Sequence, residues 1–201
     1  MKLFFYFNGF NSAILDDFSN NPKIVAAADY AINKGFRFIP VSIDYRHACS
    51  HREEILEQLD DKAREIIFCG SSMGGWFARI MQLSLAHRRQ GLKLTAIAFN
   101  PAYDVSLHQH LLLGPQQNHV TLEEYDWTRA NNQALVALEE QIDYDADLPF
   151  YVYCDKGDEI ISWAESAARH SGISRFLAFE GGCHSFDHFN EALMDFNGRY
   201  S

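Results

Sequence analysis

The stretch from residue 65 to residue 76 constrains the fold more than any other part of the chain. Its apolar run from Ile66 to Cys69 predicts a fully buried strand, and the residues from Trp76 onward have the spacing of an amphipathic helix. The sequence Gly-Ser-Ser-Met-Gly connects the two segments. Strand, Gly-x-Ser-x-Gly and helix in this order form the layout of a nucleophile elbow, which makes Ser72 the candidate nucleophile.

The glycines of this motif follow from the shape of such a turn. The turn forces the central serine into strained backbone angles, and side chains two positions before and after it would clash with the neighbouring strand and helix. Gly70 and Gly74 avoid that clash. A glycine-rich turn can also be an ordinary strand-to-helix connection, so the motif alone leaves both interpretations open. A phosphate-binding loop is excluded, because Trp76 stands where the lysine of that motif belongs.

The composition is that of one globular domain. The 201 residues are enough for a single substantial core, with 47% apolar and 22% charged residues. The formal net charge of −10 argues against a nucleic-acid partner, and no apolar stretch reaches membrane-spanning length. The four cysteines are scattered, which favours reduced thiols in a cytoplasmic protein over a disulfide framework. We therefore expect no nucleic-acid or membrane partner, and the oligomeric state stays open.

Strand and helix patterns alternate along most of the chain. Short apolar runs predict strands at residues 3–7, 36–43, 66–69, 94–99, 150–154 and 176–179. Helices are expected between them, with start signals at Pro22, at Ser50 with Glu53 and at Ser162 with Glu165, and with a last helix over residues 186–196. Pro40 inside the second strand indicates a sheet edge or a bend. The alternation predicts an α/β fold with a mostly parallel sheet and helices on both faces.

The segment from residue 102 to about residue 147 departs from this alternation. We expect two helical segments within it, at residues 122–127 and 133–142. His108 and His110 also fall in this segment, where surface histidines are the default expectation. A connection of this length is long for a plain crossover, and such insertions tend to be functional. The prediction is therefore a single domain over all 201 residues with a small helical insertion that acts as a lid.

Candidate reactive residues follow three of the predicted strands. In such a sheet, functional residues gather beyond the carboxyl ends of the strands. Ser72 follows the third strand, Asp155 and Asp158 follow the fifth, and His184 follows the last. Serine, carboxylate and histidine in this chain order are typical of the α/β-hydrolase fold. A serine hydroxyl needs an imidazole to take its proton and a carboxylate to orient that imidazole. We therefore predict the triad Ser72, Asp158 and His184, which needs no metal and no organic cofactor.

Each member of this triad has neighbours that could compete with it. Asp155 lies on the same loop as Asp158, but we prefer Asp158 because it lies past the glycine turn, at the outward tip of the loop. His188 follows His184 by one helical turn, a spacing that can bind metal. The glutamate of a His-Glu-x-x-His zinc site is missing, so we expect His188 to be a solvated helix residue. Cys183 is expected to fill a tight turn rather than to act as a redox thiol.

The predicted chemistry also requires an oxyanion hole and a pocket. Two converging backbone N–H groups are needed for the oxyanion. We assign one to Met73 and the other to Phe10 in the loop after the first strand, with Asn11 as the less favoured choice. Aromatic side chains lie in the hydrophobic core more often than in a pocket. The candidates for an apolar substrate pocket are Phe10, Trp76, Tyr103, Trp127 and Trp163.

A resemblance to a known family is carried by five segments, which are Tyr6 to Ser12, Gly70 to Trp76, Phe99 to Pro101, Lys156 to Glu159 and Glu180 to Phe186. They are similar to the small bacterial YqiA-like esterases, and the likeness spans nearly the whole chain. The resemblance implies a compact α/β-hydrolase with Ser72, Asp158 and His184 at the family's catalytic positions. That family usually has His-Gly-Phe after the first strand, whereas this chain has Asn8 in place of the histidine. Asn8 can still hydrogen-bond across the loop, so we expect the oxyanion geometry to be kept.

These observations together predict a serine esterase or thioesterase. Its substrate would be a small-molecule acyl ester or acyl-thioester, hydrolysed through an acyl-enzyme. One alternative is a non-catalytic α/β-hydrolase-fold protein that binds an acyl ligand, although such a protein has no use for an aligned serine and histidine. A second alternative is a dedicated esterase that removes a methyl ester from a carrier-bound acyl chain.

Overall fold

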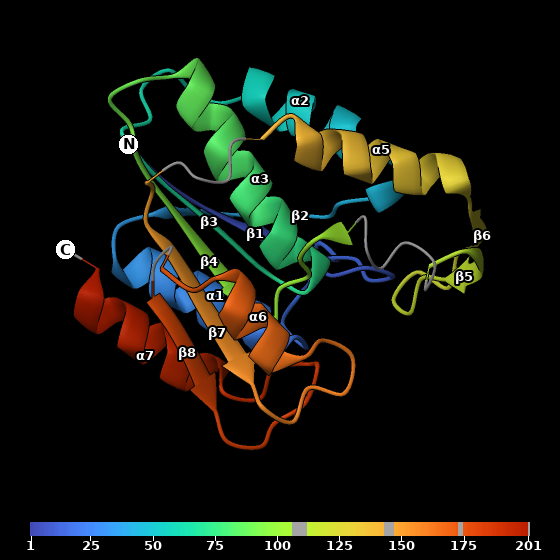
Figure 1. Ribbon diagram of the computed structural model, residues 1–201. Coiled ribbons are helices and arrows are strands. Elements are labelled where there is room, and N and C mark those ends of the chain that lie inside the picture. The colour runs from blue at the N-terminus through green and yellow to red at the C-terminus, as the bar shows by residue number, and fades with distance from the viewer. Residues whose placement is uncertain (106–111, 143–146, 173–174, 201) are drawn as a thin grey trace.

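The central element of the fold is a parallel sheet (Figure 1). The computed structural model describes residues 1–105, 112–142, 147–172 and 175–200, and within them six strands lie in the order β2-β1-β3-β4-β7-β8. Their bounds are β1 (Lys2–Phe7), β2 (Arg37–Val41), β3 (Glu65–Ser71), β4 (Lys93–Phe99), β7 (Phe150–Asp155) and β8 (Arg175–Phe179). All neighbouring pairs run parallel. The predicted α/β sheet is confirmed, and Pro40 lies in β2 at the sheet edge, where its missing N–H interrupts no second neighbour.

Helices cover both faces of this sheet. Successive side chains of a strand point to opposite faces, so one strand contributes side chains to both layers. The helices are α1 (Pro22–Asn33), the short 3-10 turn η1 (Tyr45–His47), α2 (Ala48–Glu57), α3 (Met73–Arg88), α5 (Arg129–Glu140), α6 (Trp163–Arg169) and α7 (Phe189–Arg199). Phe5 and Phe7 of β1 pack in the cluster that includes α2, α3 and α5, whereas Phe4 and Tyr6 pack with α1 and α7 (Figure 1). No helix within the described ranges is long and apolar enough to cross a membrane.

Two of the predicted helix starts are wrong. Helix α2 begins at Ala48 after His47, so Ser50 lies inside the helix and does not cap it with Glu53. Helix α7 begins at Phe189, because Phe186 has a φ of 65° and lies in a tight turn before it. The start at Ser162 is confirmed, since its Oγ accepts a hydrogen bond from the N–H of Glu165.

The insertion contains a hairpin in addition to a helix. Strand β5 (Gly114–Gln117) pairs antiparallel with β6 (Glu124–Trp127), so the helical segment predicted at residues 122–127 is wrong. In β6 the exposed Glu124 and Asp126 alternate with the more buried Tyr125 and Trp127, which is the period of a strand. The second predicted segment is confirmed as α5, capped by Thr128. His108 and His110 lie outside the described residues.

Candidate active site

Ser72 lies at the turn between β3 and α3, and its backbone has the strained angles that the motif predicts. Its φ is 55° and its ψ is −125°. A Cβ on Gly70 would lie 2.4 Å from the backbone of Gly74, and a Cβ on Gly74 would lie 2.4 Å from the carbonyl oxygen of Phe7. These approaches leave no room for side chains, so the two glycines let the turn pack closely against β1. The turn therefore holds Ser72 at the carboxyl edge of the sheet.

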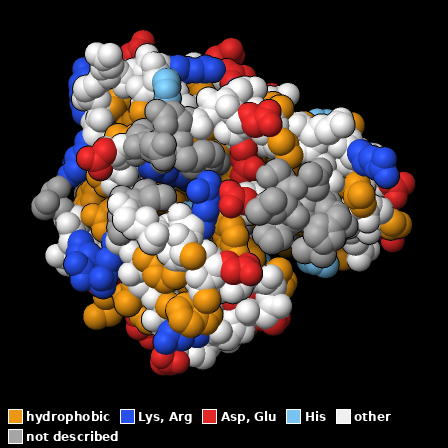
Figure 2. Space-filling model, in the orientation of Figure 1, with side chains coloured by type: hydrophobic (Ala, Val, Ile, Leu, Met, Phe, Trp, Pro, Cys, Tyr) orange, Lys and Arg blue, Asp and Glu red, His pale blue; other side chains and the backbone are white. Residues whose placement is uncertain are grey.

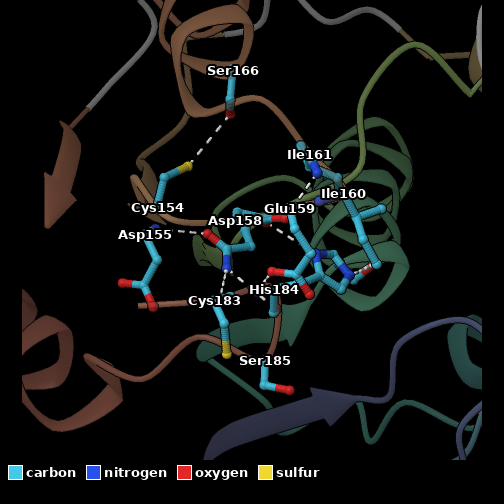
Figure 3. A network of polar contacts seen from close by, with 12 residues as sticks. Cys154, Asp155, Asp158, Glu159, Ile160, Ile161, Ser166, Cys183, His184 and Ser185 are labelled. Atoms are coloured by element: carbon cyan, nitrogen blue, oxygen red, sulfur yellow. Dashed lines mark hydrogen bonds and ion pairs between the residues drawn. The ribbon is translucent and has the colours of Figure 1, made fainter. Parts of the chain in front are cut away.

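His184 connects Ser72 to Asp158. Its Nε2 lies 3.1 Å from Oγ of Ser72, and its Nδ1 lies 3.0 Å from Oδ2 and 3.1 Å from Oδ1 of Asp158. The N–H groups of Ile160 and Ile161 also donate to Oδ1 of Asp158, at 2.8 Å each (Figure 3). The three predicted residues, which come from three separate loops, therefore form one hydrogen-bonded series.

The charge state of Asp158 fixes the tautomer of the histidine. Burial raises the pKa of Asp158, but the hydrogen bonds from His184, Ile161 and Ile160 outweigh burial and lower that pKa below its ordinary value. An ionised carboxylate can only accept, so the hydrogen of the imidazole lies on Nδ1. Nε2 is then free to accept the hydroxyl hydrogen of Ser72.

Asp155 contacts a different histidine. It is fully buried, and its Oδ1 lies 2.7 Å from Nδ1 of His188 while its Oδ2 accepts the N–H of Asp187 at 2.7 Å. Figure 3 shows the carboxylate of Asp155 directed away from His184. The prediction that His188 is a solvated helix residue is wrong, since its ring also stacks on Phe179 with centroids 4.9 Å apart. The cause is a partner 33 positions earlier in the chain, which helical spacing does not reveal.

Two further residues hold the loop that carries His184, and the sequence reasoning did not assign them. The side-chain Nδ2 of Asn100, just after β4, donates to the carbonyl oxygens of Cys183 at 2.9 Å and His184 at 3.2 Å. Its Oδ1 accepts the N–H of Asp155 at 2.8 Å. The carboxylate of Glu159 accepts the N–H of His184 at 3.0 Å. Asn100 directly follows β4 and Glu159 lies in the loop after β7, and this position is the signal that the sequence offers.

The loop after β1 passes directly against Ser72. A Cβ on Gly9 would lie 3.5 Å from Cβ of Ser72. Among the described residues, the backbone N–H groups of Phe10 and Met73 have no hydrogen-bond acceptor. Asn8 hydrogen-bonds across this loop as expected, because its Nδ2 donates to the carbonyl oxygens of Ser12 and Ile43. The N–H of Met73 directly follows Ser72 in the chain and that of Phe10 follows Gly9, so both are candidate donors near the serine.

The five aromatic residues proposed for the pocket separate into different places. Trp76 and Tyr103 line one cavity of about 50 Å³, next to Gly75 of the elbow helix. Trp127 lies against the ring of Phe10, and Trp163 lies beneath the ammonium group of Lys156.

The cavity beside Gly75 is also lined by four charged side chains, which are Asp104, Glu139, Arg79 and Arg169. Figure 2 shows acidic and basic side chains close together around a hollow near the middle of the face that is turned to the viewer.

No metal site is evident at these loops. Within the part of the chain that the structure describes, no group of three or more His, Cys, Asp or Glu side chains is arranged to hold a metal ion. His184 and His188 each hydrogen-bond through Nδ1 to a separate carboxylate. Cys183 lies in the turn before His184, with its Sγ 3.4 Å from Oδ1 of Asp187. Hydroxyl, imidazole and carboxylate are hydrogen-bonded in the order that activation of a serine nucleophile requires.

Comparisons with known proteins agree with this geometry at the level of the fold. A family model described as uncharacterised protein family UPF0227 matches residues 3–197. No curated protein matches the chain. Among solved structures, Est1E from Butyrivibrio proteoclasticus superposes with a TM-score of 0.71 at 17% identity, covering 98% of this chain and 87% of that one. A further Est1E structure contains bound ferulic acid.

Two other solved structures are similar over nearly their whole length. A putative hydrolase of the α/β superfamily from Xanthomonas campestris has a TM-score of 0.62 at 17% identity, covering 98% of this chain and 96% of that one. A monoacylglycerol lipase from Paleococcus ferrophilus has a TM-score of 0.60 at 12% identity, covering 97% of this chain and 93% of that one. The chain therefore has the α/β-hydrolase fold.

Proposed function

Because the chain belongs to the uncharacterised protein family UPF0227, we propose its function from the site itself: it is a serine hydrolase that cleaves carboxylic esters or thioesters. The observation that carries this proposal is the series of hydrogen bonds from Ser72 through His184 to Asp158. Structural neighbours that include esterases and lipases support the same reaction class.

The reaction proceeds in two steps. Oγ of Ser72 attacks the carbonyl carbon while Nε2 of His184 takes the hydroxyl proton, and Asp158 stabilises the imidazolium that forms. The N–H groups of Phe10 and Met73 donate to the oxyanion of the tetrahedral intermediate. His184 then gives the proton to the departing alcohol or thiol. Water, activated by the same imidazole, hydrolyses the acyl-enzyme and restores Ser72.

The substrate is a small acyl ester or acyl-thioester. The cavity beside the elbow, lined by Trp76 and Tyr103 together with charged side chains, is the candidate site for a small acyl group. Est1E binds ferulic acid, so esters of hydroxycinnamic acids belong in a substrate screen beside simple acyl esters. The mechanism requires neither a metal nor an organic cofactor.

A fluorophosphonate probe tests the proposal directly, because it reacts covalently with an activated serine. We expect labelling of the unmodified protein at Ser72 and complete loss of labelling in Ser72→Ala. Ser71→Ala is the matched control, because Ser71 precedes Ser72 in the same motif and should leave labelling intact. A screen over p-nitrophenyl esters of increasing chain length and acyl-CoA thioesters then identifies the substrate. An unlabelled, folded protein that binds acyl ligands without turnover would contradict the proposal and favour a ligand-binding function.

A further inference from the structure

The loop after β1 is fixed before Phe10 by the side chain of Asn8. Oδ1 of Asn8 accepts the N–H of Ile43 at 2.6 Å, and its Nδ2 donates to the carbonyl oxygen of Ser12 at 2.7 Å. The hydroxyl of Tyr45 donates to the backbone carbonyl of Asn8 at 2.6 Å. One end of the loop is thus tied to the chain beyond β2.

The same loop is fixed after Phe10 by Asn11, which hydrogen-bonds to the β5–β6 hairpin. Nδ2 of Asn11 donates to Oε1 of Gln116 at 2.8 Å, and its Oδ1 accepts the hydroxyl of Tyr125. Its backbone carbonyl accepts the N–H of His119 at 2.8 Å. Asn11 has a φ of 54°, a left-handed conformation that asparagine adopts more readily than most residues. Both polar side-chain atoms and the carbonyl of Asn11 therefore contact one element of the insertion.

The hairpin is itself held in place. The guanidinium of Arg46 lies over the ring of Tyr125 at 4.3 Å and pairs with Glu123 at 2.8 Å. The ring of Phe10 meets that of Trp127, at the end of β6, edge to face with centroids 5.0 Å apart. Trp127 is only 2% exposed. Besides Asn11, the hairpin is thus contacted by Arg46 and by Phe10.

We propose that Asn11 is a positioning residue that holds the N–H of Phe10 in place by tying its loop to the β5–β6 hairpin. This inference rests on the proposed function, in which that N–H donates to the oxyanion. An oxyanion donor acts only when it lies about 2.7–3.1 Å from the developing charge, and misplacement by about 1 Å can reduce the rate about 100-fold. The insertion therefore contributes to the reaction by fixing the oxyanion hole.

Three variants test this role. Asn11→Gly keeps the left-handed backbone but removes both side-chain hydrogen bonds. Tyr125→Phe removes one of the same bonds from the hairpin side and keeps the ring under Arg46. Gln117→Ala is the matched control, because Gln117 is an exposed residue of β5 that makes no side-chain hydrogen bond within the described residues. Hydrolysis of p-nitrophenyl acetate gives kcat and KM. The inhibition constant of a trifluoromethyl ketone, which forms a tetrahedral oxyanion adduct with the serine, reports on the oxyanion hole.

We expect Asn11→Gly to lower kcat by about 10- to 100-fold while KM stays within about twofold of the unmodified protein. The inhibition constant of the ketone should rise by a factor similar to the loss in kcat. Tyr125→Phe should produce a smaller loss of the same kind. The double variant should be no worse than Asn11→Gly, because both changes remove the same bond. Gln117→Ala should match the unmodified protein.

Retention of kcat and ketone affinity in folded Asn11→Gly and Tyr125→Phe would overturn the role of Asn11, even if both variants melt at lower temperature. Should Asn11→Gly fail to fold, the comparison of Tyr125→Phe with Gln117→Ala decides the question. Unmodified protein with neither turnover nor labelling at Ser72 would instead overturn the proposed function, and this inference with it.

Discussion

Asp155 and Asp158 share the loop after β7, yet each carboxylate is hydrogen-bonded to a different histidine. Oδ1 of Asp155 lies 2.7 Å from Nδ1 of His188, and Oδ2 of Asp158 lies 3.0 Å from Nδ1 of His184. Asp155 is the last residue of β7 and is directed into the core, whereas Asp158 lies past the turn at Gly157. The two acids should therefore have separable effects on activity and stability.

Asp158→Asn should reduce kcat by about 10⁴-fold while leaving the fold intact. The amide can donate to Nδ1 of His184, which favours the tautomer with hydrogen on Nε2 and removes the base from Ser72. The measurement is kcat with p-nitrophenyl acetate, and the melting temperature of the variant serves as the control for folding. A loss smaller than about tenfold would exclude Asp158 as the orienting acid.

Asp155→Asn should instead act mainly on stability. Its carboxylate accepts from the N–H of Asp187 and from the ring of His188, so the amide would leave one buried donor unpaired and cost about 2–4 kcal/mol in the free energy of unfolding. Urea denaturation measures this cost. His188→Gln is the companion variant, expected to cost less because the bond from Asp187 stays. If Asp155→Asn, corrected for folded protein, lost as much activity as Asp158→Asn is expected to lose, the assignment of the acid would be reversed.

Asn8→Asp should destabilise the protein more than Asn8→Ala. The Nδ2 of Asn8 faces the carbonyl oxygens of Gly9, Ser12 and Ile43, so a carboxylate oxygen there would meet three acceptors and no donor. We expect a loss of about 3 kcal/mol or more for Asp and about 1–2 kcal/mol for Ala. Urea denaturation at neutral pH checks the order, and an equal cost for the two variants would contradict it.

The elbow and the three proposed catalytic residues could be located from the sequence because each has a local signature. Gly70 and Gly74 bracket Ser72, and the loops that carry Asp158 and His184 directly follow strands that the apolar pattern marks clearly. The parallel order of the strands then requires these loops to meet at one edge of the sheet. The sequence therefore predicts that these loops lie at one edge of the sheet, but not the distances between their side chains.

The hairpin and the second histidine lack such signatures. Strand β5 contains glycine, proline and two glutamines, a composition that favours no strand, and its pairing depends on β6 and on contacts with Asn11. His188 follows His184 by one helical turn, which suggested a solvated helix face, but the carboxylate of Asp155 at the end of β7 determines where its ring lies. Tertiary contacts of this kind override local pattern.

Glu65→Gln should destabilise the protein at neutral pH and have less effect in acid. Burial raises the pKa of Glu65, but hydrogen bonds from Lys2, Tyr200 and Lys93 outweigh it and lower the pKa to about 2. The carboxylate therefore stabilises the folded state above the ordinary pKa, and this contribution is lost as the pH falls from about 4.5 towards 2. The melting temperatures of Glu65→Gln and the unmodified protein should therefore converge as the pH falls across this range. A constant difference would show that the effect of the substitution is steric rather than electrostatic.

His170→Phe should make the protein less sensitive to mild acid. The ring of His170 makes edge-to-face contacts with Tyr103 and Phe150, and neither ring nitrogen has a hydrogen-bond partner in the described part of the chain. Burial lowers the pKa of His170 to about 4, and the charges of Arg169 and Arg79 act in the same direction.

The unfolded chain binds a proton at His170 below about pH 6.5, whereas the folded protein does so only near pH 4, so the wild-type protein loses stability between these values. Between pH 7 and pH 5, His170→Phe should lose about 1–2 kcal/mol less than wild type in the free energy of unfolding. His170→Gln has a different shape and polarity but also lacks the titrating ring. Its pH dependence should therefore match that of His170→Phe. Urea denaturation at several pH values gives the free energy of unfolding of each protein. If this free energy changed equally with pH in all three proteins, His170 would be charged in the folded state as readily as in the unfolded chain.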